Sequence, residues 1–353
     1  MTSLHEVALL RLAAQWVTGP RGTPAEAVRR LGALQGQDFP GAVISIALRT
    51  ADRRRKDVEV ALDDGEIVRS WPMRGTLHVL AAEDLRWMLD LLCTRVLAGL
   101  TARWAQLELT EADAERAREI VLATLTGDRR MRRTDLLAAI DDAGVATTGQ
   151  RGAHLLGYLA RTGTVCLGPT DGAGEQLFVL LDEWVRAPRR LSGDEALGEL
   201  ARRFFLGHGP ATVHDLARWA GVPLRDARAG LVLARPDLDT LDVEGVEHFL
   251  DPATPDRLAA CRAEAEGLFL LPGFDEFVLG YRDRRAVLDP EFAERIVPGN
   301  NGMFRATVVH EGRIVGTWRW TGRGAKRTVT ATPFTSFTKE VDGLIRDRAA
   351  DLH

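Results

Sequence analysis

The sequence predicts an α+β protein with three tandem winged-helix modules and a C-terminal β-barrel-like domain. Two observations lead to this prediction. An order of three helices and a β-hairpin recurs with a period of about 80 residues. The last part of the chain then changes to short β-rich runs separated by glycine turns. The modules are expected at residues 1–105, 106–190 and 191–262, and the β-domain with a terminal helix at 263–353.

The first module begins with apolar residues at helical spacing over residues 4–17. Thr23, Pro24 and Glu26 then form a strong helix start, with Thr23 as N-cap and Glu26 three residues later. This second helix is expected to run into Gln35. The remaining elements of the module are an apolar segment, a helix and a hairpin, at residues 43–48, 55–64 and 67–80.

The second module repeats this order. Its three helices and its hairpin are expected at residues 107–125, 135–143, 149–162 and 164–181. Thr134 is expected to cap the middle helix. In the third module, residues 210–222 have the pattern of a helix-turn-helix, in which Gly221 ends a capped helix. No residue string repeats closely, so the repetition lies in the element order alone.

The C-terminal domain is predicted from β-branched and aromatic runs that glycine-containing turns separate. The expected strands cover residues 268–271, 277–281, 307–309, 314–320 and 328–331. A helix at 336–350 is expected to close the chain. The pattern fits an open sheet or a barrel.

Composition is that of a soluble globular protein, with 45% hydrophobic and 27% charged residues in 353. Neither a membrane-spanning run nor a signal peptide pattern is present, so we expect a cytoplasmic, nucleoid-associated protein. The net charge of -4 is not the overall footprint of a nucleic-acid binder. Clustered arginines still allow one basic face, although solvated loops explain any single cluster more simply. The three cysteines fit no zinc or redox spacing, and we expect them to be buried and inert.

Common catalytic motifs are missing from the sequence. It has no H-E-x-x-H, no Walker lysine loop, no G-x-G-x-x-G after a strand and no G-x-S-x-G elbow. The eight histidines include no pair at metal-ligand spacing. No metal or cofactor is therefore expected.

Gln35 and Gln37 stand one residue apart where Gly36, Phe39 and Pro40 break the helical period. An extended backbone would send both amides to one side. Each amide offers one acceptor and two donors, so the pair could hold a water or stabilise a developing positive charge, but neither can remove a proton. A hydrogen-bonding pair at a helix end is the alternative interpretation of these residues taken alone.

Several segments together resemble the winged-helix DNA glycosylases of the AlkZ and YcaQ type. In order, they are LGALQGQD, MRGTLHVLAAEDLRW, LFVLLDEW, LLPGFDEFVLGYRDR, NGMF and GRIVGTWRW. The resemblance implies three winged helices and a β-barrel around duplex DNA, and excision of bulky or crosslinked N7-alkylpurines. It also implies a catalytic Gln-x-Gln signature, matched by Gln35 and Gln37. The glutamine pair is typical of the branch that protects antibiotic producers from their own DNA-alkylating products.

The chemistry of such a lesion agrees with the resemblance. An N7-alkylated guanine is cationic and leaves as a neutral base, so cleavage needs little general-acid help. What remains is to stabilise the oxocarbenium-like sugar and to position water, and preorganised amides can do both. Asp38 is an alternative base, although helix capping or a salt link is the interpretation we favour for it.

Six residues are candidate DNA contacts, each with a structural alternative. They are Arg74, His78, Arg282, Arg284, Asn300 and Asn301. For His78 a packing role is the interpretation we favour, and a hairpin turn explains the asparagines equally well. Asp275 and Glu276 would repel phosphate, so we expect them to pair with Arg282 or Arg284.

The sequence thus predicts a metal-free, monofunctional DNA glycosylase that acts as a monomer on double-stranded DNA carrying alkylpurine lesions. A non-catalytic winged-helix transcriptional regulator is the competing hypothesis. A relative that has lost activity is a third, because Gly36 stands where an apolar residue is common in the family.

Overall fold

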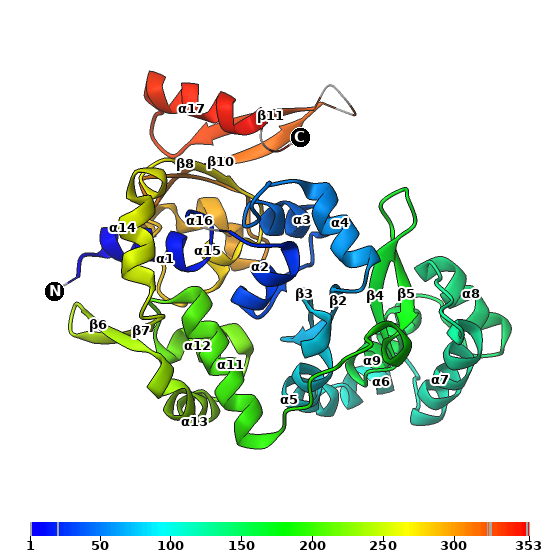
Figure 1. Cartoon of the computed structure of the whole chain (residues 1–353). Helices are drawn as coiled ribbons and strands as arrows, with labels where there is room; N and C mark the ends of the chain where they lie inside the picture. The colour runs from blue at the N-terminus through cyan, green and yellow to red at the C-terminus, as the bar shows by residue number, and fades with distance from the viewer. Residues whose placement is uncertain (1, 20, 323, 325–326, 351, 353) are drawn as a thin grey trace. The chain divides into compact units, whose positions relative to one another are not determined.

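The computed structural model describes the chain except for residues 1, 20, 323, 325–326, 351 and 353 (Figure 1). The chain forms two compact units. The larger unit contains Met1–Arg55 and Gly198–His353, and the smaller unit contains Lys56–Leu197. None of the helices in the described part of the chain is long and apolar enough to cross a membrane.

The smaller unit is built on a four-stranded antiparallel sheet in the order β3-β2-β4-β5. Two hairpins far apart in sequence form this sheet. Their strands are β2 (Ile67–Met73), β3 (Thr76–Ala81), β4 (Val165–Thr170) and β5 (Gln176–Leu180). Both hairpins were expected from the sequence. Their pairing through Arg69 and Leu167 was not, because each hairpin was assigned to a separate module.

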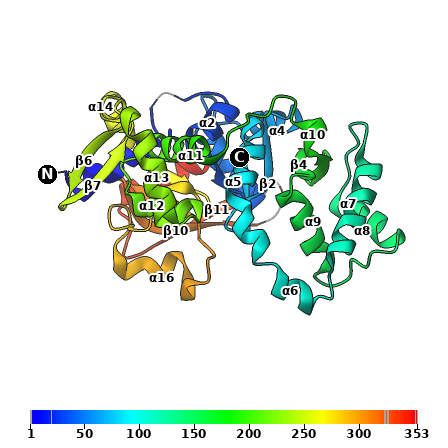
Figure 2. The same cartoon turned by 90° about the horizontal axis from the view of Figure 1, so that it is seen from below.

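Helices flank these strands in the chain. They are α4 (Arg55–Asp63), α5 (Leu85–Ala98), α6 (Thr101–Gln106), α7 (Glu111–Leu125), α8 (Arg133–Asp142), α9 (Arg151–Arg161) and α10 (Leu181–Trp184). Figures 1 and 2 both show α7 and α8 side by side. Leu125, Leu136 and Leu159, one from each of α7, α8 and α9, share a core with Phe178 of β5. The prediction that Thr134 caps α8 is wrong, because the N-cap position is Arg132 and Thr134 lies inside the first turn.

The larger unit begins with α1 (Leu4–Ala14), α2 (Pro24–Leu31), β1 (Leu34–Gln35) and α3 (Phe39–Ala47). The capping box of Thr23 and Glu26 is present at the start of α2. The prediction that this helix runs into Gln35 is wrong. Gly32 adopts a φ of +74°, a conformation that ends a right-handed helix, and the chain then extends through Gln35.

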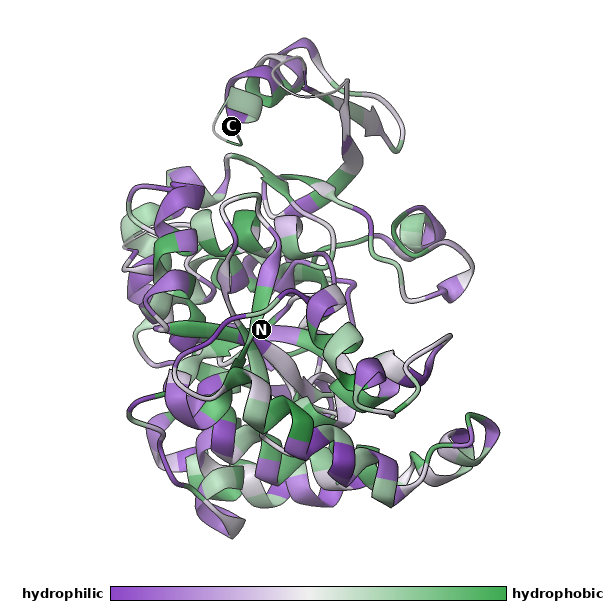
Figure 3. Cartoon of the chain, turned by 90° about the vertical axis from the view of Figure 1, so that its right-hand side faces the viewer, coloured by the Kyte–Doolittle hydropathy of each residue, from purple (hydrophilic) through white to green (hydrophobic). Residues whose placement is uncertain are grey.

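The third helical group and its hairpin also belong mostly to this unit. Its elements are α11 (Gly193–His208), α12 (Val213–Ala220), α13 (Leu224–Ala234), β6 (Asp239–Val243) and β7 (Val246–Leu250). Gly221 takes the left-handed conformation that ends α12, as the helix-turn-helix pattern predicted. The helices carry both hydrophobic and hydrophilic residues along their length (Figure 3), so each can bury one face and expose the other.

A four-stranded antiparallel sheet in the order β11-β10-β9-β8 follows α14 (Thr254–Ala265). The strands are β8 (Leu268–Leu271), β9 (Thr307–His310), β10 (Arg313–Thr321) and β11 (Thr328–Pro333). No closed barrel is found among the described residues, and of the two forms that the sequence allowed, an open sheet or a barrel, the structure has the open sheet. Helix α17 (Lys339–Ala350) places Val341 and Ile345 in one core with Leu268 and Trp318, so that the sheet buries a face without closing on itself.

Two smaller expectations for this domain are also wrong. The segment 277–281 was expected as a strand, but it begins inside α15 (Glu276–Leu279), which Asp275 caps by accepting from the Phe277 N–H. Asn300 was expected at a hairpin tip. It instead ends a short 3-10 turn (Pro298–Asn300) that follows α16 (Ala293–Ile296) and precedes β9.

Candidate active site

Gln35 and Gln37 lie on the segment between α2 and α3. The Gln35 backbone N–H donates to Glu276 Oε1 at 3.0 Å, and the Gln37 backbone N–H donates to Gln35 Oε1 at 2.7 Å. The second bond closes a small local turn around Gly36. Gln35 is 8% exposed, whereas Gln37 is an exposed residue. The segment therefore presents one enclosed and one open amide.

The two amides differ in what they can still bind. The carbonyl oxygen of Gln35 already accepts the Gln37 N–H, so the Gln35 NH2 group retains its two donors. The Gln37 side chain has no hydrogen bond to any described residue, and its acceptor and both donors are available. Only Gln37 can offer an uncommitted carbonyl oxygen to a water molecule or a cationic sugar.

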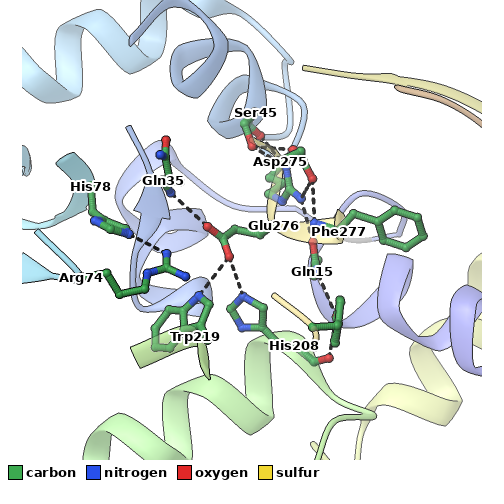
Figure 4. A network of polar contacts seen from close by, with 12 residues as sticks. Gln15, Gln35, Ser45, Arg74, His78, His208, Trp219, Asp275, Glu276 and Phe277 are labelled. Carbon is green, nitrogen blue, oxygen red and sulfur yellow. Dashed lines mark hydrogen bonds and ion pairs between the residues drawn. The ribbon is translucent and has the colours of Figure 1, made fainter. Parts of the chain in front are cut away.

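Glu276 holds the glutamine segment through the backbone of Gln35 (Figure 4). While its Oε1 accepts from Gln35, its Oε2 accepts from Trp219 Nε1 at 3.0 Å and lies 3.3 Å from His208 Nε2. All three side chains are buried. Three segments far apart in sequence thus meet at one carboxylate, and Gln35 is hydrogen-bonded to a group that is itself held in place.

Asp275, the residue before Glu276, is held by a separate set of partners. Its carboxylate forms a two-pronged pair with Arg49, both distances being 2.9 Å, and accepts from Ser45 Oγ at 2.6 Å. Burial alone would raise the pKa of Asp275, but the Arg49 guanidinium and the hydrogen bonds outweigh it and lower the pKa below its ordinary value. The prediction that Asp275 and Glu276 pair with Arg282 or Arg284 is wrong, since their partners are Arg49, Trp219 and His208.

The buried polar network extends from this pair to α1 and α11. Arg49 also donates to Gln15 Oε1 at 2.8 Å, and Gln15 Nε2 donates to the Tyr281 hydroxyl at 2.9 Å. Tyr281 in turn donates to the His208 carbonyl at 2.7 Å. Burial raises the pKa of Tyr281, so this hydroxyl remains a hydrogen-bond donor. We infer that the network serves to hold the glutamine segment rather than to transfer protons.

Asp38 occupies the N-cap position of α3, as the capping interpretation requires, but its side chain makes no capping hydrogen bond. The carboxylate is exposed and has no ion pair with any residue that the structure describes. A Cβ added to Gly41 would meet Asp38 Oδ2 at 2.5 Å, so the carboxylate lies over the first turn of the helix. It therefore leaves a negative charge next to Gln37.

Arg282 and Arg284, two of the candidate DNA contacts, have different environments. The Arg282 side chain is exposed and has no hydrogen bond or ion pair to the described residues, while its backbone N–H donates to Asp215. Arg284 is half-buried, donates to the Val278 carbonyl at 2.8 Å and stacks over Phe304. Burial and then the charge of Arg218 lower the pKa of Arg284 to about 10.

Arg74 and His78 belong to the hairpin of the smaller unit. Arg74 and Gly75 form its tip, and both have positive φ, which is the geometry of a type I′ turn. His78 is buried, with Nδ1 2.9 Å from the Thr76 carbonyl and Nε2 3.1 Å from Arg74 (Figure 4). In this arrangement Arg74 donates to a neutral imidazole, and His78 holds the arginine at the tip.

Asn300 and Asn301 are exposed, and Asn301 Oδ1 accepts from the Met303 N–H at 2.9 Å. Asn300 has a positive φ of 50°. These are turn-forming features, and both side chains still face solvent.

Sequence reasoning did not identify Arg49, His208 and Trp219 as parts of this site. Their contacts span from 57 residues, between Trp219 and Glu276, to 226 residues, between Arg49 and Asp275. No local pattern marks such contacts. The one available signal was the FDEF segment, in which two acidic residues between two phenylalanines would need partners if the segment were buried. Among the described residues, no three His, Cys, Asp or Glu side chains come together as metal ligands would.

The comparisons with known proteins show the family of the chain. Residues 28–353 match the family model of AlkZ-like DNA glycosylases. An interstrand DNA cross-link repair glycosylase from Streptomyces sahachiroi is 28% identical over 320 residues, covering 85% of this chain and 83% of that protein. The solved structure of the Streptomyces sahachiroi DNA glycosylase AlkZ superposes with a TM-score of 0.79 and 26% identity, over 99% of this chain and 96% of that one. The chain therefore belongs to the AlkZ-like DNA glycosylase family.

Proposed function

We propose that this glycosylase hydrolyses the N-glycosidic bond of N7-alkylated purines, including bulky and crosslinked ones, and leaves an abasic site. The observation that carries the proposal is the exposed side-chain amide of Gln37, whose backbone N–H donates to Gln35 Oε1, in a chain of this family. The relative named as an interstrand cross-link repair glycosylase supports crosslinked DNA as a substrate. Both general repair and self-protection against an alkylating product fit this activity.

In this mechanism Gln37 provides the acceptor that orients water or faces the cationic sugar, and Gln35 fixes Gln37 through its backbone. The Asp38 carboxylate, one residue further, adds a negative potential that favours a cationic base over a neutral one. Since neither glutamine is a base, normal purines, whose leaving groups are poor, would react slowly. Selectivity for alkylated purines would follow from this modest catalytic power.

For the architecture, we propose that each order of three helices and a hairpin is a winged helix, with the module bounds given above. Arg74, Arg282, Asn300 and Asn301 are the proposed DNA contacts, with His78 and Arg284 in support of neighbouring residues. The protein would act as a monomer on double-stranded DNA in the nucleoid. The family match argues against a purely regulatory winged-helix protein.

Release of 7-methylguanine from methylated duplex DNA tests the function. We expect the native protein to release the base without cutting the strand, and Gln37→Ala to lose most of this activity. Gln35→Ala should lose less if its role is to hold Gln37. Gln150→Ala is the matched control, because Gln150 is an exposed glutamine at the N-cap of α9. Equal activity in all four proteins would contradict the assignment of the glutamines.

A further inference from the structure

A pocket of about 520 Å³ begins beside the glutamine segment. Asp38, the residue directly after Gln37, forms part of its wall. All of its lining residues belong to the larger unit. Its volume lies within the range of small-molecule sites, about 300–1,000 Å³. The pocket is therefore large enough for a ring-bearing group, and it adjoins the segment that carries Gln37.

Four aromatic side chains and three arginines are among the fifteen residues that line this pocket. Phe274 and Phe304 come from two loops, with ring centroids 6.1 Å apart, and Trp318 and Trp320 come from β10, with centroids 5.6 Å apart. Arg327 lies over the Trp320 ring at 4.3 Å. Such walls favour a flat, apolar or aromatic group, which can stack on the rings or on the guanidinium plane.

The backbone that holds Phe274 is strained. Phe274 has a φ of 62°, which is unusual for a bulky residue. A Cβ added to the preceding Gly273 would meet the Phe304 carbonyl oxygen at 2.7 Å, so only glycine allows the two loops to approach this closely. Strain of this kind persists where surrounding structure enforces it, and it is concentrated at binding sites. The two phenylalanine rings are thus held at the pocket rather than in the core.

We propose that this pocket binds the aromatic or apolar arm of a bulky N7 substituent while the sugar lies at Gln37. The inference rests on the proposed function and assigns the place where the bulky group is bound. A methyl group offers little area for stacking on these rings, whereas a substituent that carries a ring can stack on Phe304 or Trp320. The pocket therefore determines which alkylated purines are preferred, and Gln37 determines how the bond breaks.

Two duplexes that differ only in the N7 group test the proposal. One carries a single 7-benzylguanine and the other a single 7-methylguanine. In single-turnover reactions, Phe304→Ala and Trp320→Ala should each slow excision of 7-benzylguanine roughly 10-fold, as expected for loss of one aromatic stacking partner. Excision of 7-methylguanine is measured in the same variants, and the ratio of the benzyl rate to the methyl rate should fall roughly 10-fold. Phe292→Ala is the control, because Phe292 is also half-buried but stacks on Phe334 outside the pocket.

Equal losses on both duplexes, or no loss on either, would overturn the pocket assignment while leaving the glycosylase proposal intact. If the native protein excises neither base, the glycosylase proposal fails. The affinity of the protein for the two duplexes then tests the pocket assignment separately. Duplexes with the non-hydrolysable 2′-fluoroarabino forms of the two lesions then serve as probes. If the native protein binds the benzyl duplex more tightly than the methyl duplex, and Phe304→Ala loses this difference, the pocket assignment is supported. If the native protein binds both duplexes equally, the pocket assignment is rejected.

Discussion

At the scale of single residues, Glu276 is the group that ties the glutamine segment to the rest of the larger unit. Its carboxylate accepts hydrogen bonds from the Gln35 backbone N–H and from Trp219 Nε1, and it lies 3.3 Å from His208 Nε2. We expect Glu276→Gln to place an NH2 group against at least one of these donors and to displace Gln35. The rate of excision should fall roughly 10-fold, because an unsatisfied buried donor costs about 1–3 kcal/mol.

Glu276 is a positioning residue, so affinity and rate should separate in the Glu276→Gln variant. Single-turnover excision should fall while the Kd for undamaged duplex stays the same, since Glu276 is buried and faces no solvent. Glu247→Gln provides a control at an exposed ion pair with Arg235. An equal loss of rate and of affinity would instead indicate general damage to the fold.

Asp275 gives a prediction about pH. Its pKa is lower in the folded protein than the unfolded value of about 3.9, because Arg49 and hydrogen bonds outweigh its burial. A group with a lowered folded pKa stabilises the fold fully above the unfolded pKa and loses that contribution as the pH falls through the folded value. The Asp275 contribution should therefore be present at pH 7 and disappear below about pH 4.

Urea unfolding from pH 7 to pH 3 measures this contribution. Asp275→Asn leaves the buried Arg49 charge unpaired and should cost about 3–5 kcal/mol at pH 7. Its stability should also fall less steeply toward pH 3 than that of the native protein. Asp142→Asn, at an exposed position in α8, should match the native curve. Parallel curves for the native protein and Asp275→Asn would show that the pair does not titrate in this way.

At the scale of elements, the capping box at the start of α12 also contacts the backbone of Arg282, a candidate DNA contact. Thr212 and Asp215 hydrogen-bond each other, and Asp215 Oδ1 also accepts from the Arg282 N–H at 2.7 Å. Thr212→Ala should cost about 1–2 kcal/mol in unfolding free energy, because a buried carboxylate loses a partner. Thr110→Ala removes the similar but exposed box of α7 and should cost less, and Thr212→Ser should restore stability. A smaller loss for Thr212 than for Thr110 would contradict this difference.

Local patterns predicted most of the elements, and long-range contacts explain the failures. The capping residue Thr23 and the helix-ending Gly221 act within a few residues, so the sequence reveals them. In 277–281 the β-prone residues form a helical turn instead, because Asp275 caps it and Glu276 must reach Gln35. The sequence left an open sheet and a barrel as alternatives for the same reason, because the packing of α17 on the sheet brings together Leu268 and Ile345, which are 77 positions apart.

The candidate site shows the same division. Gln35 and Gln37 could be singled out because two amides at a broken helical period are a local pattern. The local turn between them, and the commitment of the Gln35 oxygen to Gln37, depend on backbone geometry that the residue types do not specify. The Arg49 and Asp275 pair spans 226 residues and had no signal beyond the need of a buried carboxylate for a partner.

At the scale of the whole molecule, a net charge of -4 means that overall charge does not attract DNA. Affinity for phosphates must then come from individual exposed cations. Each cation that neutralises a phosphate contributes about 0.9 to the slope of log affinity against log salt concentration. The slope therefore counts the arginines that contact the backbone, whatever the lesion.

Arg282 and Arg284 form a matched pair for this measurement, because they are two residues apart and differ mainly in exposure. Arg282→Ala should reduce the salt slope by about 1, since its side chain is exposed and unpaired among the described residues. Arg284→Ala should leave the slope unchanged and lower the unfolding free energy instead, since Arg284 is held by the Val278 carbonyl and the Phe304 ring. If Arg284→Ala changes the slope and Arg282→Ala does not, the DNA backbone must reach the half-buried arginine, and the proposed contact surface would have to move toward Phe304.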